Sequence, residues 1–291
     1  MRTLRFHALV SFVLAPAALA AFCGALVAAD RARPQAARHY VLKLRLPPSA
    51  GEIGLPRIAG PLDASAPLVV IDAGHGGHDP GAGQGDVAEK DITLELARAL
   101  RDRLIGQGGV RVALTRETDR YLLLAERAGI ARRLNADLFI SLHADSAANP
   151  DATGATVYTL SDKGSSDEAQ RLAVAENRAD AVNGMVFAGQ SDAVSAILVD
   201  LAQRETVARS QAFAGLMLRE GRGNLRFRER AMQSAAFVVL KSADVPSVLL
   251  EAGYLSNTDD AAGLASAEWR SQFAVVTARA IRIFFARGGS A

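Results

Sequence analysis

Two histidines and two glutamates lie where they could carry out metal-assisted chemistry. His75 lies in the glycine-rich sequence AGHGG and His143 in ISLHA, each directly after an apolar run. Glu89 opens a segment with helical periodicity, and Glu251 ends the apolar run VLLE. Two neutral imidazoles and one carboxylate are a common ligand set for catalytic zinc, which leaves the fourth position to water. A further carboxylate beside that water can take its proton and pass it to a leaving amine.

Each of these residues also has an ordinary structural explanation. A histidine after a strand is often a hydrogen-bonded residue of the core, Glu89 can favour a helix N-terminus, and Glu251 can belong to a buried ion pair. The glycine-rich loop Gly74–Gly85 lets backbone approach a ligand closely. The chain has no His-Glu-x-x-His segment, which excludes the familiar metalloprotease arrangement. Spacing alone leaves a zinc hydrolase and a structural role equally open.

Strands alternate with helices from residue 67 onward. Apolar runs and helical periodicity predict strands over residues 68–73, 110–115, 137–142, 154–160, 237–240 and 247–251, and helices over 90–105, 121–134, 192–218 and 268–287. This order predicts an α/β fold with a single mixed, mostly parallel β-sheet of about six strands, flanked by helices on both faces. Sites of such sheets gather in the loops at the carboxyl ends of the strands.

The first 29 residues resemble an export signal. Arg2 and Arg5 precede an uncharged apolar run that contains Pro16 and ends in small residues, which favours a cleaved signal peptide over a retained membrane anchor. Cys23, the only cysteine, lies in this segment, so cleavage leaves no disulfide and no thiol chemistry. The remaining chain carries 31 basic and 31 acidic residues, because Arg2 and Arg5 are lost, and nothing indicates nucleic-acid binding.

The rest of the chain divides into three predicted parts. Residues 30–66 are a linker or short N-terminal extension, rich in proline and alanine. Residues 67–287 form the catalytic domain. Within it, residues 162–204 belong to a helical excursion longer than a simple crossover requires, which predicts a covering or regulatory insertion.

Six motifs together resemble one enzyme family. The sequence is similar, from about residue 67 to 286, to the zinc-dependent N-acetylmuramoyl-L-alanine amidases of the type-3 class. The motifs that carry the resemblance are VIDAGHGG from Val70, EKD from Glu89, LTRETD from Leu114, LxxR ending at Arg127, FISLHA from Phe139 and PSVLLEAGYLSN from Pro246.

The resemblance implies one zinc ion per chain, held by His75, Glu89 and His143, with Glu251 as the catalytic acid and base. It implies hydrolysis of the amide between N-acetylmuramic acid and L-alanine in peptidoglycan. Asp72 would orient His75 as an outer neighbour of the metal site.

Two residues near the motifs receive separate interpretations. His78 is interpreted as a loop histidine, because relatives tolerate other residues there. Asp145 departs from the family's usual asparagine, which affects the expected positioning of substrate but not the chemistry.

The helical excursion resembles an insertion in the division-associated branch of the family, where a helix blocks the active site until an activator with a LytM-type domain displaces it. Glu205 is then the candidate resting-state zinc ligand; alternatively it is a solvated helix residue paired with Arg209. The resemblance also implies a periplasmic, monomeric enzyme that takes part in wall remodelling and daughter-cell separation, without a membrane span after cleavage. Residues 30–66 are too short for a wall-targeting AMIN domain.

Two rival functions remain open. One is a zinc peptidase that cuts within the stem peptide, which the residues alone separate poorly from the amidase. The other is a catalytically inactive wall-binding regulator, which the presence of all four candidate residues disfavours.

Overall fold

The structure is a computed structural model, and it describes residues 54–84, 87–179, 193–242 and 244–288. The predicted signal peptide, most of the predicted linker and part of the predicted insertion lie outside these residues. Among the described residues, no helix combines the length and apolar character that a membrane span requires.

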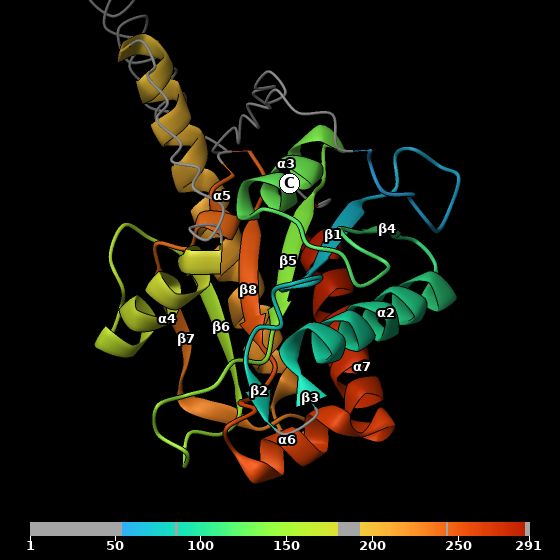
Figure 1. Cartoon of the computed structure of the whole chain (residues 1–291). Helices are drawn as coiled ribbons and strands as arrows, with labels where there is room; N and C mark the ends of the chain where they lie inside the picture. Colours follow the sequence, from blue (N-terminus) through green and yellow to red (C-terminus); the bar gives the residue numbers. More distant parts are fainter. Residues whose placement is uncertain (1–53, 85–86, 180–192, 243, 289–291) are drawn as a thin grey trace, which may run out of the picture. The chain divides into compact units, whose positions relative to one another are not determined.

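A six-stranded mixed sheet forms the centre of the fold (Figure 1). Its order is β4-β1-β5-β8-β6-β7, and β1, β4, β5 and β8 run parallel to one another while β6 and β7 run opposite to them. The strands are β1 Leu68–Ala73, β4 Arg111–Leu114, β5 Leu138–His143, β6 Ala155–Leu160, β7 Phe227–Ala235 and β8 Ser247–Glu251. The predicted α/β class and the mixed, mostly parallel sheet are confirmed.

Helices cover both faces of this sheet, as predicted, because side chains of the central strands alternate between two apolar layers. Val69 and Ile71 of β1 pack with α2 (Glu89–Gln107), α5 (Ala193–Gly221) and α7 (Ala267–Gly288). Val70, between them, packs in the opposite layer with α3 (Leu124–Arg133) and α4 (Asp167–Asn177). A short helix, α6 (Thr258–Ala265), precedes α7.

One predicted strand is wrong. Residues 238–240 form the 3₁₀ helix η2 (Val238–Leu240), and the sixth strand is instead β7 (Phe227–Ala235). Charged residues occupy most of the first half of β7, and burial becomes regular only at Gln233 and Ala235. Because β7 is an edge strand, it tolerates exposed charged residues such as Glu229 and Arg230, which hide the strand pattern.

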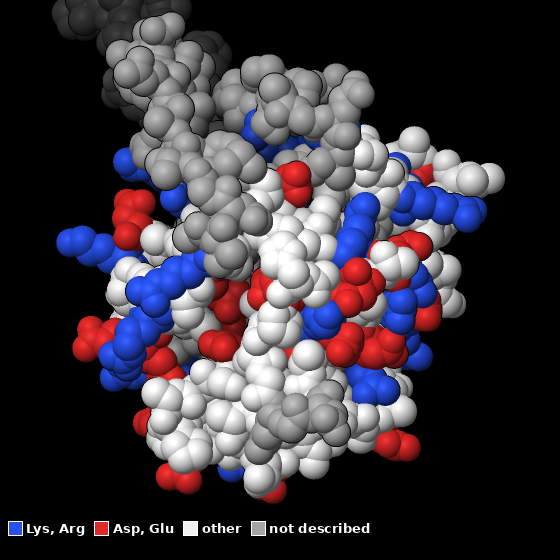
Figure 2. All heavy atoms as spheres, viewed as in Figure 1, with Lys and Arg blue, Asp and Glu red and all other residues white. Residues whose placement is uncertain are grey.

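The glycine-rich loop after β1 carries a small antiparallel hairpin, β2 (Gly83–Gln84) with β3 (Val87–Ala88), which leads directly into α2. The predicted helical excursion after β6 contains α4 and α5. On the face that Figure 2 shows, acidic and basic side chains are interspersed rather than gathered into a large field of one sign.

Three neighbouring strands bring the candidate residues to one edge of the sheet. Because β1, β5 and β8 are adjacent and parallel, their carboxyl ends meet. One residue, Gly74, separates His75 from the end of β1. His143 and Glu251 are the last residues of β5 and β8, and they lie opposite each other in register. Glu89 is the first residue of α2.

Candidate active site

His75 is held in an unusual backbone conformation with one ring nitrogen already occupied. Its φ angle is +59°, in the left-handed region that a non-glycine residue rarely adopts. Its Nδ1 lies 2.9 Å from Asp79 Oδ2, and its carbonyl oxygen accepts a hydrogen bond of 2.7 Å from Arg127. With Nδ1–H donated to Asp79, the lone pair of Nε2 points into the site, as a metal-binding histidine requires.

Glu89 lies between the two histidines and is fully buried. Its Oε2 accepts a 2.8 Å hydrogen bond from Ala82 N–H, and its Oε1 accepts one of the same length from Ala144 N–H. The same two oxygens lie 3.2 Å from His75 Nε2 and 3.1 Å from His143 Nδ1. Two backbone donors therefore fix a carboxylate whose remaining lone pairs face both imidazoles.

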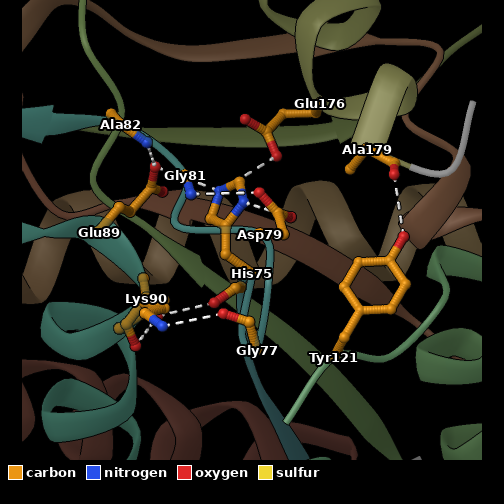
Figure 3. Close-up of polar contacts among 12 residues, drawn as sticks. His75, Gly77, Asp79, Gly81, Ala82, Glu89, Lys90, Tyr121, Glu176 and Ala179 are labelled. Carbon is orange, nitrogen blue, oxygen red and sulfur yellow. Dashed lines mark hydrogen bonds and ion pairs between the residues drawn. The ribbon is translucent and has the colours of Figure 1, made fainter. Parts of the chain in front are cut away.

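A second glutamate enters this cluster from α4. Glu176 Oε2 lies 3.3 Å from His143 Nδ1. The same oxygen lies 3.7 Å from His75 Nε2 (Figure 3). Its side chain is buried although α4 is otherwise a surface helix. The donor atoms of His75, His143 and Glu176 all lie within 4.8 Å of one another.

The charges of the cluster are strongly coupled. Burial opposes protonation of both rings, but Glu89, Asp79 and Glu176 outweigh it and raise the pKa of His75 well above its ordinary value. Burial likewise lowers the pKa of His143, but Glu176 and Glu89 outweigh this effect and raise it. Burial favours the neutral form of Glu89, but the two imidazoles hold its pKa well below the ordinary value. The site therefore demands positive charge between its carboxylates, which protons or a metal ion can supply.

The donor set fits a metal ion. Two ligands that are each about 2.1 Å from a tetrahedral zinc lie about 3.4 Å apart, and the four nitrogen–oxygen separations given above run from 3.1 to 3.7 Å. His75 Nε2 is buried and has no hydrogen-bond partner. A Cβ on Gly81 would lie 2.6 Å from both Glu89 Oε2 and His75 Cδ2, so the loop fits closely around the donors.

Glu251 lies beside this cluster as a separate, fully buried carboxyl group. Its Oε2 accepts a 3.1 Å hydrogen bond from Asp145 N–H, whereas its Oε1 is buried without a partner. Burial and the neighbouring carboxylates Glu89, Asp145 and Glu176 raise its pKa well above the ordinary value. Burial and the same glutamates of the metal cluster raise the pKa of Asp145 to about 7. The raised pKa brings Glu251 closer to the range in which a carboxyl group can both take up and release a proton.

Comparison with known proteins identifies the family. Residues 69–282 match the Amidase_3 family, described as N-acetylmuramoyl-L-alanine amidase. The chain belongs to this family. It is a hydrolase of the amide between N-acetylmuramic acid and L-alanine in peptidoglycan, as the sequence motifs predict.

Individual relatives agree with this assignment. The N-acetylmuramoyl-L-alanine amidase AmiA of Escherichia coli is 37% identical over 220 residues, which cover 75% of this chain and 76% of AmiA. AmiC of Neisseria meningitidis is also 37% identical, over 72% of this chain and 50% of its own length. Among solved structures, the amidase AmiC2 of Nostoc punctiforme is 29% identical with a TM-score of 0.54, covering 76% of this chain and 97% of that one.

The outer neighbour of His75 differs from the prediction. Asp72 makes no contact with His75; it bonds to Thr115, Arg127 and Ser141, and Asp79 holds the histidine ring instead. Asp72 acts on His75 only through Arg127, which donates to the backbone of the histidine.

The helical glutamate that lies against the histidines is not the one named from the sequence. Glu205 is exposed on α5, and Glu176 is the helical glutamate that reaches the histidines. Ala169, Leu172 and Ala173 form a buried stripe on α4. Glu176, seven residues after Ala169, lies on the same stripe. A carboxylate at a position that amphipathic spacing reserves for an apolar residue is the signal that could have identified it.

His78 is a loop residue, as interpreted. It is exposed and its ring lies 4.2 Å from that of Tyr121. Tyr121 in turn donates a 2.9 Å hydrogen bond to the carbonyl of Ala179, just after α4 (Figure 3). Asn177 fixes the same helix end by bonding to the backbone of Ala236 and Val238. These contacts hold Glu176 against the histidines.

Replacing Gly81 with alanine should loosen the donor cluster, because the new Cβ would collide with Glu89 and His75. We expect Gly81→Ala to lose about tenfold or more in affinity for a divalent metal ion, measured by competition with a chromophoric chelator using Zn²⁺. Gly106→Ala is the matched control, because a Cβ there meets nothing within 4 Å. Equal affinities of the two variants would contradict the close fit of this loop.

Proposed function

We propose that this chain is a zinc-dependent amidase of the periplasm whose active site is blocked at rest by its own helix α4. The single observation that supports this proposal best is the convergence of His75, His143, Glu89 and Glu176 around one point, with Glu251 beside it. The expected cellular role is wall remodelling during daughter-cell separation.

His75, Glu89 and His143 are the residues that would hold the zinc ion in the working enzyme. When bound, zinc supplies Lewis acidity toward the amide carbonyl and toward the attacking water. Asp79 contacts Nδ1 of His75 and so directs Nε2 toward the site, and two backbone N–H groups keep Glu89 oriented. The chain thereby offers its ligands in a fixed arrangement.

Glu251 would carry the proton through the reaction. Asp145 N–H anchors its Oε2, and this leaves Oε1 free to accept a proton from the attacking water. The same oxygen then delivers that proton to the amide nitrogen of L-alanine, which leaves as a free amine. The apolar strands β5, β6 and β8 surround the carboxyl group and keep its proton affinity high.

Helix α4 would hold the enzyme at rest. Glu176 lies against both histidines, so its carboxylate would compete with substrate and water for the metal. Because α4 is fixed at its C-terminal end by Tyr121 and Asn177, release requires a partner that breaks these bonds. A LytM-type activator is the partner that the sequence resemblance implies.

The remaining parts of the proposal rest on the sequence. Residues 1–29 would direct export and be removed, and residues 30–66 would be a linker or short N-terminal extension. Residues 67–287 would form the catalytic domain, which would act as a monomer. The helical insertion, predicted over residues 162–204, would contain the block through α4.

Release of stem peptides from purified sacculi tests the reaction. With zinc, the chain from residue 30, carrying Glu176→Ala, should release peptides that begin at L-alanine, identified by mass spectrometry. Adding Glu251→Gln should slow release by about 10²–10⁴-fold, because the proton carrier is lost. Fragments cut within the peptide would favour a peptidase, and undiminished release by Glu251→Gln would contradict the assigned role.

Basal activity of two glutamate variants tests the block. We expect Glu176→Ala to raise activity on sacculi about tenfold or more over the unmodified chain, since one charged contact to the site is removed. Glu205→Ala is the matched control and should leave activity unchanged, because its side chain is exposed. A rise with Glu205→Ala alone would instead support the glutamate that the sequence first suggested.

A further inference from the structure

A cavity of about 400 Å³ lies between α4 and the sheet, next to the catalytic carboxyl group. Its lining comes from the loop after β5, from α4, and from β6, β7 and the turn after β8. It adjoins Glu251, because Asp145 lines the cavity and donates its N–H to that carboxylate. Tyr158, Glu168, Arg228 and Tyr254 are among the polar and aromatic residues that line the cavity.

Arg228 of β7 and Arg171 of α4 both line this cavity, and Arg228 is the one that belongs to the sheet and that a carboxylate of α4 neutralises. Its Nη1 lies 2.6 Å from Glu168 Oε1 and 3.1 Å from the hydroxyl of Tyr254. The guanidinium group also stacks over the Tyr254 ring, 5.1 Å from its centre. Arg228 has only 19% of its side chain exposed, while Glu168 has 40%. The arginine is therefore fixed by the sheet, and the carboxylate that neutralises it arrives with α4.

A second polar group in the cavity lacks a partner. Tyr158 is fully buried in β6 and lines the cavity, and its hydroxyl makes no hydrogen bond. A buried hydroxyl without a partner costs free energy, and such groups often mark a place where a ligand completes the bonding. Tyr158 and Arg228 thus offer a donor and a cation to the same ligand.

Glu168 and Glu176 both belong to α4, and they lie eight residues apart in the sequence. Glu168 neutralises Arg228 and Glu176 faces the histidines. At 1.5 Å per residue the two positions are about 12 Å apart along α4. An extended peptide covers this distance in about three to four residues.

We propose that Arg228 binds a carboxylate of the peptide on the L-alanine side of the scissile amide, and that Glu168 takes the place of this carboxylate in the resting enzyme. The inference rests on the proposed function, because it assumes that α4 leaves the site for substrate to enter. The muramoyl side is excluded as the ligand, since its lactyl carboxyl group is consumed in the amide that is cleaved. Helix α4 then mimics the substrate at two points.

Peptide binding to the full chain tests this subsite without requiring catalysis. The probes are synthetic N-acetylmuramoyl peptides of three residues with free or fully amidated peptide carboxylates, studied by titration calorimetry. Glu168→Gln should bind the free-acid probe about tenfold more tightly than the unmodified chain does, because the competing carboxylate is gone. Adding Arg228→Gln should abolish the preference for the free acid, whereas Arg228→Lys should keep part of it.

Arg230→Gln is the matched control, because Arg230 lies on the same strand, is exposed, and removes the same charge. It should leave the preference of Glu168→Gln intact. Equal binding of both probes by Glu168→Gln, or a preference that survives Arg228→Gln, would overturn the subsite. Hydrolysis is followed separately with the Glu176→Ala chain, where failure to cleave either probe would count against the proposed function and not against the subsite.

Discussion

The buried ion pair of Asp72 and Arg127 is the interaction on which the site's geometry depends. Asp72 also accepts hydrogen bonds from Thr115 of the loop after β4 and Ser141 of β5, so one carboxylate ties together the strands that carry the histidines. The guanidinium N–H groups of Arg127 also donate hydrogen bonds to backbone carbonyls. One of these carbonyls is that of His75, whose φ angle is +59°. Removing one partner of such a pair costs about 3–5 kcal/mol, because the other charge stays buried alone.

This rigid frame supports a cluster whose buried carboxylates require positive charge beside them. Two carboxylates, Glu89 and Glu176, face two imidazoles, and Asp79 already contacts the other ring nitrogen of His75. Protons or a metal ion can balance these carboxylates, and α4 supplies the second of them. The same helix satisfies Arg228 with Glu168. Both charged contacts come from one amphipathic helix, and they are the basis of the proposed restraint and of the proposed substrate mimicry.

The positions of His143 and Glu251 could be predicted because each is the last residue of an apolar strand. Apolar runs that stop at His143 and Glu251 place these side chains at one sheet edge in any parallel arrangement. The roles of Asp79 and Glu176 could not be predicted in the same way, since they depend on how a glycine loop and a surface helix fold back over that edge. Strand β7 was missed because its edge position tolerates charge. Glu176 differs from Glu205 in that it continues the buried stripe of α4, a distinction that depends on which face of each helix packs against the sheet.

X-ray absorption spectroscopy at the zinc edge tests the central claim most directly. The zinc-loaded full chain should show two imidazole nitrogens and carboxylate oxygens at about 2.0–2.2 Å. In Glu176→Ala the histidine scattering should persist while one carboxylate oxygen is replaced by water, and Glu205→Ala should give the spectrum of the unmodified chain. A site without histidine scattering, or one that Glu176→Ala leaves unaltered while Glu205→Ala changes it, would contradict the account.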